Sequence, residues 1–114
     1  MNYLDYIKTI IEPKKETETK VSFKTHLNGG GLVSEDSQIE ETVYVGKDVK
    51  VINSIIKGNT VISGKAQVIN SKISGNSWIF GNAICENSEI NEWTMIFGNA
   101  HIKNETINKF EVRK

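Results

Sequence analysis

Three residues of this chain could carry out catalysis. Cys85 is its single cysteine, a potential nucleophile, and His26 and His101 are its two histidines, potential general bases. A catalytic cysteine requires an exposed position and a nearby base, whereas Cys85 aligns with aliphatic residues of the repeat described below. We therefore expect a buried thiol. Neither histidine lies in a recognisable catalytic motif, so we predict no catalytic residue, and His101 is the only candidate.

Two further patterns could bind ligands. Residues 29–31 are three consecutive glycines, but a phosphate-binding loop would continue with Lys-Ser or Lys-Thr into a helix, and neither follows. Polar residues also recur every 17 positions at Asp36, Asn53, Asn70, Asn87 and Asn104. Amides alone are poor metal ligands, and no carboxylate or histidine cluster joins them. We predict no metal site and no cofactor, and expect these amides to stack and hydrogen-bond along one corner.

Size and charge restrict the class of protein. The 114 residues predict one domain, and 14 basic residues balance 14 acidic ones, which argues against binding to nucleic acid or to anionic lipid. One cysteine excludes an internal disulfide and fits a reducing compartment. The N-terminus lacks the pattern of a signal peptide, and no apolar run approaches the roughly 18 residues of a membrane span. We expect a cytoplasmic protein.

The chain contains an internal repeat of 17 residues. The word "IFGNA" occurs at residues 79–83 and again at 96–100. Rows cut from Val51 read "VINSIIKGNTVISGKAQ", "VINSKISGNSWIFGNAI", "CENSEINEWTMIFGNAH" and a partial "IKNETINKFEVRK". The preceding row, "SEDSQIEETVYVGKDVK" from Ser34, fits more weakly. A helix, with an apolar period of 3.6 residues, cannot explain this interval.

The columns of these rows predict a triangular coil. Three of them are aliphatic at spacings of five, six and six residues; they begin at Val51, Ile56 and Ile62. A small residue stands two positions before most members, as Ser54, Thr60 and Ala66 do. Three short strands per coil, each with one large and one small inward residue, would stack at about 4.8 Å. Gly and Asn between the strands tolerate the positive φ of tight corners. We predict an all-β, single-stranded parallel β-helix of four to five coils.

The pattern resembles the hexapeptide repeat of left-handed parallel β-helices. The aliphatic residue followed four positions later by a small one, as in "ISGKAQ" and "IFGNAI", carries the resemblance, and "GNA" resembles words in bacterial and phage members. The segment "FKTHLNGGGLVSEDSQIEETVYVGKDVKV" resembles the opening of one uncharacterised group, and the resemblance covers about residues 21–107. A hexapeptide coil usually has about 18 residues, one more than here. The pattern alone leaves right-handed β-helices, such as bactofilin filaments, open.

The resemblance implies two classes of function. Many hexapeptide-repeat proteins are acyltransferases that use coenzyme A or acyl carrier protein, with a histidine as general base in a cleft between subunits of a trimer. Only His101 could take that role here, and the chain has no inserted loop to hold the donor. The uncharacterised group occurs partly in phages, which implies an inhibitor of a host protein or a sponge for a small molecule. Neither assignment follows from fold alone.

The two ends differ from the repeat. The spacing of Leu4, Ile7 and Ile11 predicts an amphipathic helix over residues 1–12, which Pro13 ends. It could cap the first coil, cover a side face or dock a partner. We predict that residues 13–33 form a linker and an entry segment, and that the β-helix occupies residues 34–114. Charged residues concentrate in the last row, and they would discourage end-to-end polymerisation of exposed strand edges.

One outward face is unexpectedly apolar. In "SWIFG" and "TMIFG" strand alternation points the Ile residues inward and Trp78, Phe80, Met95 and Phe97 outward. Val61 and Tyr44 extend the first column, and Trp93 flanks it at a corner. A patch on the order of several hundred Å² is rarely left bare on a monomer. We predict a binding interface for a homo-oligomer, trimer or dimer, or for another protein. The alternative is that the N-terminal helix covers it, while an apolar column at Ile52 and Ile69 offers that helix another place.

Overall fold

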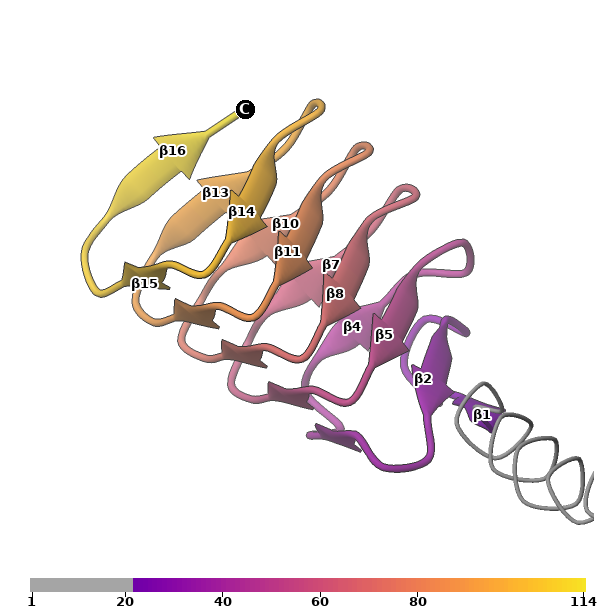
Figure 1. Ribbon diagram of the computed structural model, residues 1–114. Coiled ribbons are helices and arrows are strands. Elements are labelled where there is room, and N and C mark those ends of the chain that lie inside the picture. The colour runs from indigo at the N-terminus through magenta and orange to yellow at the C-terminus, as the bar shows by residue number, and fades with distance from the viewer. Residues whose placement is uncertain (1–21) are drawn as a thin grey trace, which may run out of the picture.

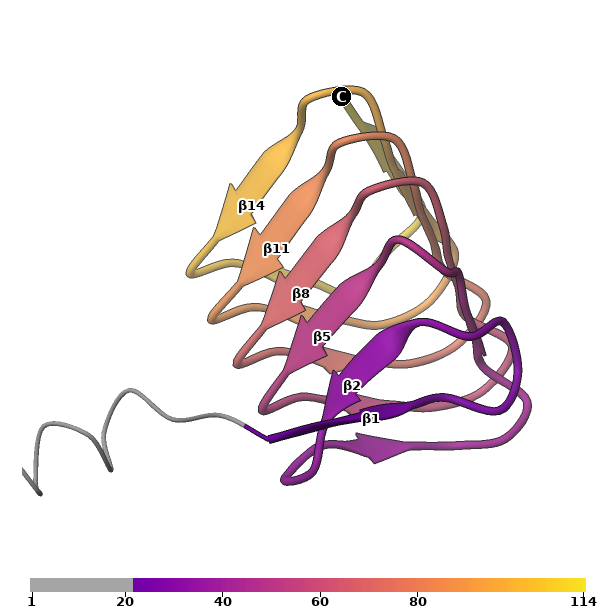
Figure 2. The same cartoon turned by 90° about the vertical axis from the view of Figure 1, so that its right-hand side faces the viewer.

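The computed structural model describes residues 22–114, which form a solenoid of five triangular coils (Figures 1 and 2). Each side of the triangle is one short strand, and strands of the same side stack into a sheet. The described residues contain strands and turns but no helix, and within them no helix is long and apolar enough to cross a membrane. The predicted all-β parallel solenoid is confirmed. The helix predicted for residues 1–12 lies outside the described residues.

Three sheets form the sides. The first sheet comprises β1 (Phe23–Thr25), β2 (Leu32–Ser34), β5 (Lys50–Ile52), β8 (Gln67–Ile69), β11 (Ile84–Glu86) and β14 (His101–Lys103). The second sheet comprises β3 (Gln38–Ile39), β6 (Ile55–Ile56), β9 (Lys72–Ile73), β12 (Glu89–Ile90) and β15 (Thr106–Ile107). The third sheet comprises β4 (Tyr44–Val45), β7 (Val61–Ile62), β10 (Trp78–Ile79), β13 (Thr94–Ile96) and β16 (Glu111–Arg113).

Pairing between the coils is parallel and places residues 17 positions apart side by side, except that β2 pairs with β5 at an interval of 18, as Val33 does with Val51. Val68 pairs with Val51 on one side and with Cys85 on the other, and Ile79 pairs with Ile62 and Ile96. Seen from the N-terminal end in Figure 2, the chain runs counterclockwise around the triangle as it recedes from the viewer. The coil is therefore left-handed, the opposite of the usual hand for crossovers between parallel strands.

The interior contains the predicted aliphatic columns. The columns are buried from Val51 to Ile102, from Ile56 to Ile107 and from Ile62 to Ile96, as are the small residues of the Ser54, Thr60 and Ala66 columns. In the fifth coil Arg113 follows Ile96 in its column and is only half-buried. Ile39, on the first strand of the second sheet, is only half-buried and packs against the core from its end. Each coil supplies only a few side chains to this narrow core, so burial is continuous only because the coils stack.

A short antiparallel strand precedes the first coil. β1 pairs with β2 so that Phe23 lies opposite Ser34 and Thr25 opposite Leu32. Gly29 and Gly30, between these strands, have positive φ values of 114° and 83°. A Cβ at Gly29 would lie 2.3 Å from the Val45 carbonyl oxygen, so only glycine fits the close approach of this turn to the first coil.

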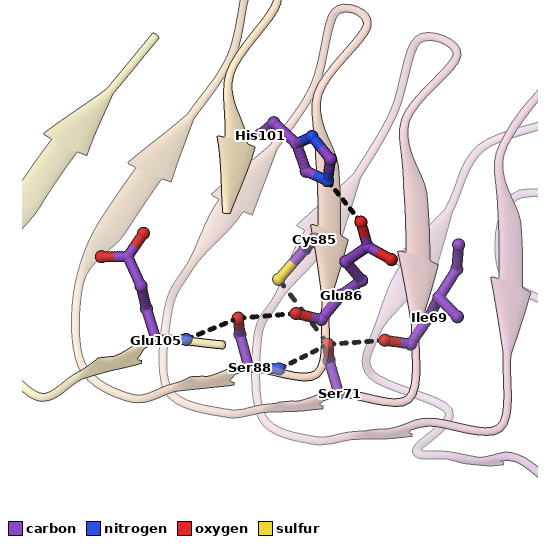
Figure 3. A network of polar contacts seen from close by, with 7 residues as sticks. All are labelled: Ile69, Ser71, Cys85, Glu86, Ser88, His101 and Glu105. Carbon is purple, nitrogen blue, oxygen red and sulfur yellow. Dashed lines mark hydrogen bonds and ion pairs between the residues drawn. The ribbon is translucent and has the colours of Figure 1, made fainter. Parts of the chain in front are cut away.

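Buried serines connect the coils at the corner between the first and second sheets (Figure 3). The hydroxyl of Ser71 donates to the Ile69 carbonyl at 2.9 Å and accepts the backbone N–H of Ser88 at 3.2 Å. The same arrangement recurs 17 residues earlier at Ser54 and 17 later at Ser88, which accepts the N–H of Glu105. We call Ser37, Ser54, Ser71 and Ser88 the serine ladder. It supplies acceptors for backbone N–H groups where the chain turns away from its strand.

At this corner the backbone also adopts positive φ. Asn53, Asn70, Asn87 and Asn104 precede the ladder positions with φ between 45° and 56°, a conformation that asparagine tolerates better than most residues. The predicted amide ladder is present in part: the Asn53 amide donates to Asn70 at 2.8 Å. The backbone N–H groups of Asn70 and Asn87 also bond to the coil below, at Ile52 and Ile69.

The last coil is closed by charged side chains. Arg113 on β16 donates to both carboxylate oxygens of Glu105, at 2.7 and 3.1 Å, and to Glu111 at 2.6 Å. The Arg113 guanidinium lowers the pKa of the Glu105 carboxyl through these hydrogen bonds. Glu105 occupies the position in the fifth coil that the ladder serines occupy in the earlier coils. We call its ion pair with Arg113 the Arg113 clamp.

Loss of one ladder hydroxyl should destabilise the solenoid. Ser71→Ala leaves the Ser88 N–H without its acceptor in a buried corner, and we expect the free energy of unfolding to fall by about 1–3 kcal/mol. Denaturant titration followed by circular dichroism measures the change. Ser63→Ala is the matched control, because Ser63 is half-buried on the outer side of the coil and should change stability by less than about 0.5 kcal/mol. Equal effects of the two substitutions would contradict the role assigned to the ladder.

Candidate binding surface

The outer surface of the third sheet presents the residues singled out in the sequence. Parallel register aligns Tyr44, Val61, Trp78, Met95 and Val112 along one column. A second column, one strand position beyond, contains Phe80 and Phe97, whose rings stack with centroids 5.1 Å apart at 5°. We call Tyr44, Val61, Trp78, Phe80, Met95 and Phe97, with Trp93 at the flanking corner, the aromatic face. Its side chains lie side by side as predicted from strand alternation.

The exposure of these side chains is uneven. Trp78 is 51% exposed and Trp93 60% exposed, while Val61, Phe80, Met95 and Phe97 are half-buried against their neighbours. Two exposed residues of the last coil extend the surface, Phe110 at 66% and Val112 at 49%. Sequence reasoning missed both, although Phe110 follows Trp93 and Val112 follows Met95 by 17 residues.

A groove runs along the corner edge of this face. It encloses about 320 Å³ and is lined by Asn59, Asn76, Trp78, Trp93, Thr94, Met95 and Phe110. Both tryptophans of the chain line it, and no lining residue carries a charge. The groove forms because Asn59, Asn76, Trp93 and Phe110 occupy one corner column while Trp78 and Met95 occupy the adjoining strand column.

The two amides of the groove differ from the other stacked amides of the protein. Asn82 donates to Asn99 at 3.5 Å and Asn91 to Asn108 at 2.6 Å, each from one coil to the next. Asn59 and Asn76 are likewise one coil apart and line the same groove, yet within residues 22–114 their side chains make no hydrogen bond with each other or with another residue. Among residues 22–114, therefore, no side chain or backbone group occupies the polar atoms of these two amides.

The backbone beside the groove has positive φ, which strains the one residue there that is not glycine. Gly58 and Gly75 have φ of 75° and 81°, and a Cβ at either would lie within 3 Å of the backbone of the next coil. In the fourth coil the same position is Glu92, with φ of 69°, which costs a residue with a Cβ about 1–2 kcal/mol. The Ser77 hydroxyl donates to the Glu92 carbonyl at 2.9 Å and holds this turn. Gly-Asn in two coils thus becomes Glu-Trp in the fourth, where Trp93 enters the groove.

The histidines lie elsewhere. His101 is exposed on β14 of the first sheet, and its Nε2 is 2.5 Å from the Glu86 carboxylate (Figure 3). A carboxylate that orients an imidazole is an element of general-base catalysis, but neither residue lines the groove beside Trp78 or three further cavities of the described residues. His26 is half-buried, and its Nε2 donates to the Val43 carbonyl at 2.8 Å, so it supports the turn before the first coil.

Cys85 belongs to the core. It is fully buried between Val68 and Ile102, and its thiol lies 3.8 Å from the Ser71 hydroxyl. Burial raises the pKa of the Cys85 thiol to about 11. The thiol is therefore protonated at neutral pH and is not a nucleophile. Within residues 22–114 no group of three His, Cys, Asp or Glu residues is placed to hold a metal ion.

No family model matches this chain, and neither a curated protein nor a solved structure matches it. The fold itself defines the class: a parallel β-solenoid repeat protein with an apolar aromatic surface along one of its three sides.

Replacement of the strained residue should stabilise the protein. Glu92→Gly removes the cost of a Cβ at positive φ, and we expect the free energy of unfolding to rise by about 1 kcal/mol. Gly75→Ala one coil earlier is the matched control and should lower it, because its Cβ would meet the Glu92 backbone. Denaturant midpoints measure both changes. A loss of stability in Glu92→Gly would show that the Glu92 side chain makes a contact that outweighs the strain.

The Cys85 thiol should be protected in the folded protein. Its burial and its pKa of about 11 both predict slow alkylation by iodoacetamide near pH 8, with rapid reaction after addition of guanidinium chloride. Mass spectrometry of timed samples measures the rates. Rapid alkylation of the native protein, at the rate of a small free thiol, would contradict the burial of this column.

Proposed function

We propose that this chain is a non-enzymatic binding or scaffolding protein of the cytoplasm that acts as a homo-oligomer, a dimer or trimer, through the aromatic face. The observation that carries the proposal is the alignment of exposed Trp78 with Met95 beside the stacked Phe80–Phe97 pair. Aromatic residues and Met are enriched in the cores of protein interfaces and supply most of their hot spots.

The other two sides of the same solenoid provide an internal comparison. On the second sheet, outward positions of successive coils are Gln38, Ile55, Lys72, Glu89 and Thr106. On the first sheet one outward column is Leu32, Lys50, Gln67, Ile84 and His101, and a second is Ile52, Ile69, Glu86 and Lys103. Most of these outward positions are polar and the others are aliphatic, so the scaffold does not need the Trp, Phe and Met residues of the third sheet. This contrast supports selection of the third sheet for contact with another surface.

Kinship with hexapeptide-repeat proteins is part of the proposal. It is supported by the left-handed coil and by one large and one small inward residue on each side of the triangle. The flat sides of such prisms pack well against each other, because straight rows of side chains can interdigitate. The same face suits a different protein partner, as expected for a phage-type inhibitor of a host protein, or a small-molecule sponge.

Acyl transfer is the competing function. The contact between His101 and Glu86 favours it, but the pair lies on the outer surface of the first sheet and lines none of the four cavities described above. We expect no turnover of acetyl coenzyme A by the purified protein. Turnover that disappears in a His101→Ala variant would replace the proposed function with catalysis.

A charge on the aromatic face should dissociate the oligomer. Phe97→Asp disrupts the stacked pair and desolvates a carboxylate in any interface formed there, so we expect a shift to monomer and a weakening of self-association by at least about tenfold. Light scattering coupled to size-exclusion chromatography measures the mass. Gln67→Asp, an exposed position of the first sheet, is the matched control and should leave the mass unchanged. A parent protein that is monomeric at all concentrations would refute self-association.

A further inference from the structure

The groove beside Trp78 and Trp93 combines features that the fold does not require. Its corner column keeps Gly-Asn in two coils and replaces this pair by Glu-Trp at residues 92–93, at the cost of a strained φ at Glu92. Strained backbone that persists next to a cavity is commonly associated with function. The strained residue directly precedes Trp93, whose exposed indole lines the groove.

The lining of the groove restricts the chemistry of what it binds. No charged side chain is among the seven lining residues, so a phosphate or ammonium group would be desolvated without a partner. A purely aliphatic chain would leave the Asn59 and Asn76 amides facing apolar atoms, which is also unfavourable. The groove instead offers aromatic faces together with amide donors and acceptors.

We propose that this groove binds one planar, uncharged heteroaromatic ring of about the size of a purine. The ring stacks on the indoles of Trp78 and Trp93, and its hydrogen-bonding edge meets the amides of Asn59 and Asn76. Base–aromatic stacking tolerates many rings because each has a π face, and an asparagine amide pairs in bidentate fashion with the adenine edge. The volume of about 320 Å³ is at the lower end for small-molecule sites, which suits one ring system rather than an extended ligand.

This inference rests on the proposed function and deepens it, since it names the ligand class of a binding protein. The two can nevertheless be separated. Trp93, Asn59, Asn76 and Phe110 line the groove, whereas Phe80 and Phe97 belong only to the aromatic face. Substitutions can therefore disturb one region without the other.

The experiment uses the intrinsic fluorescence of the full-length protein. Both tryptophans line the groove, so a ring stacked there should quench nearly the whole signal. Adenosine, guanosine and uridine are titrated as neutral probes, with excitation at the red edge of indole absorption. We expect saturable quenching by at least one of them. Trp78→Phe and Trp93→Phe each keep one indole, and the remaining indole should still be quenched.

Two paired variants test the polar contacts. Asn59→Ala combined with Asn76→Ala should weaken binding about three- to tenfold, and Trp93→Ala should weaken it about tenfold or more. Asn82→Ala combined with Asn99→Ala is the matched control, since this amide pair lies at another corner and is already hydrogen-bonded. It should leave the affinity unchanged. Circular dichroism verifies that each variant is folded.

The outcomes distinguish the ligand proposal from the proposed function. Absence of saturable quenching by all three probes at millimolar concentrations overturns the ligand site, as does quenching by methyl glucoside or a proline-rich peptide but by none of the rings. An oligomer that binds no ring retains the proposed function and loses this inference. A monomer that binds adenosine retains the inference and loses self-association. Phe97→Asp should dissociate the oligomer and keep adenosine binding.

Discussion

The whole solenoid depends on the alignment of residues 17 positions apart. Backbone N–H groups of one coil donate to carbonyls of the next on every side, as from Lys57 to Ile73 and from Ser63 to Ile79, and these bonds form only if successive coils follow the same path. Side chains are aligned by the same constraint. Inward residues at equivalent positions of successive coils therefore stack on one another and form the core. Outward residues at equivalent positions stack in the same way and form rows on the surface.

The three corners meet this constraint with different chemistry. Between the first and second sheets the chain turns at asparagines with positive φ, each followed by a ladder position. At the other two corners it turns mainly at glycines with positive φ. Glu92 is the departure from this scheme, because a glycine would fit its φ without strain. The strain at Glu92 lowers stability at the corner that adjoins the groove, and such a departure from the local rule is a feature associated with functional sites.

The core could be predicted from the sequence almost residue by residue, because a buried column tolerates few residue types and so repeats visibly. Cys85 is identified by its column alone. The sequence predicts the ladder serines only as small inward residues. Their hydrogen bonds could not be predicted, because they depend on the direction of the backbone N–H groups at the corner. Phe110 and Val112 were missed because the last row lacks the Gly-Asn-Ala word and has charged residues on both sides of each, so the row does not resemble an apolar strand. The contact of His101 with Glu86 joins neighbouring strands diagonally, and no column reveals a diagonal.

The period of 17 residues also restricts how such a chain can change over time. Gain or loss of one residue within a strand displaces every later column, so core positions would receive outward residues. A corner can hold one additional residue, as the first coil does between β2 and β3. Gain or loss of a complete coil preserves all columns and only lengthens or shortens the prism, provided that the Arg113 clamp remains at its end. Variation in length should therefore occur in whole coils, and each added coil would extend the aromatic face by about one strand spacing.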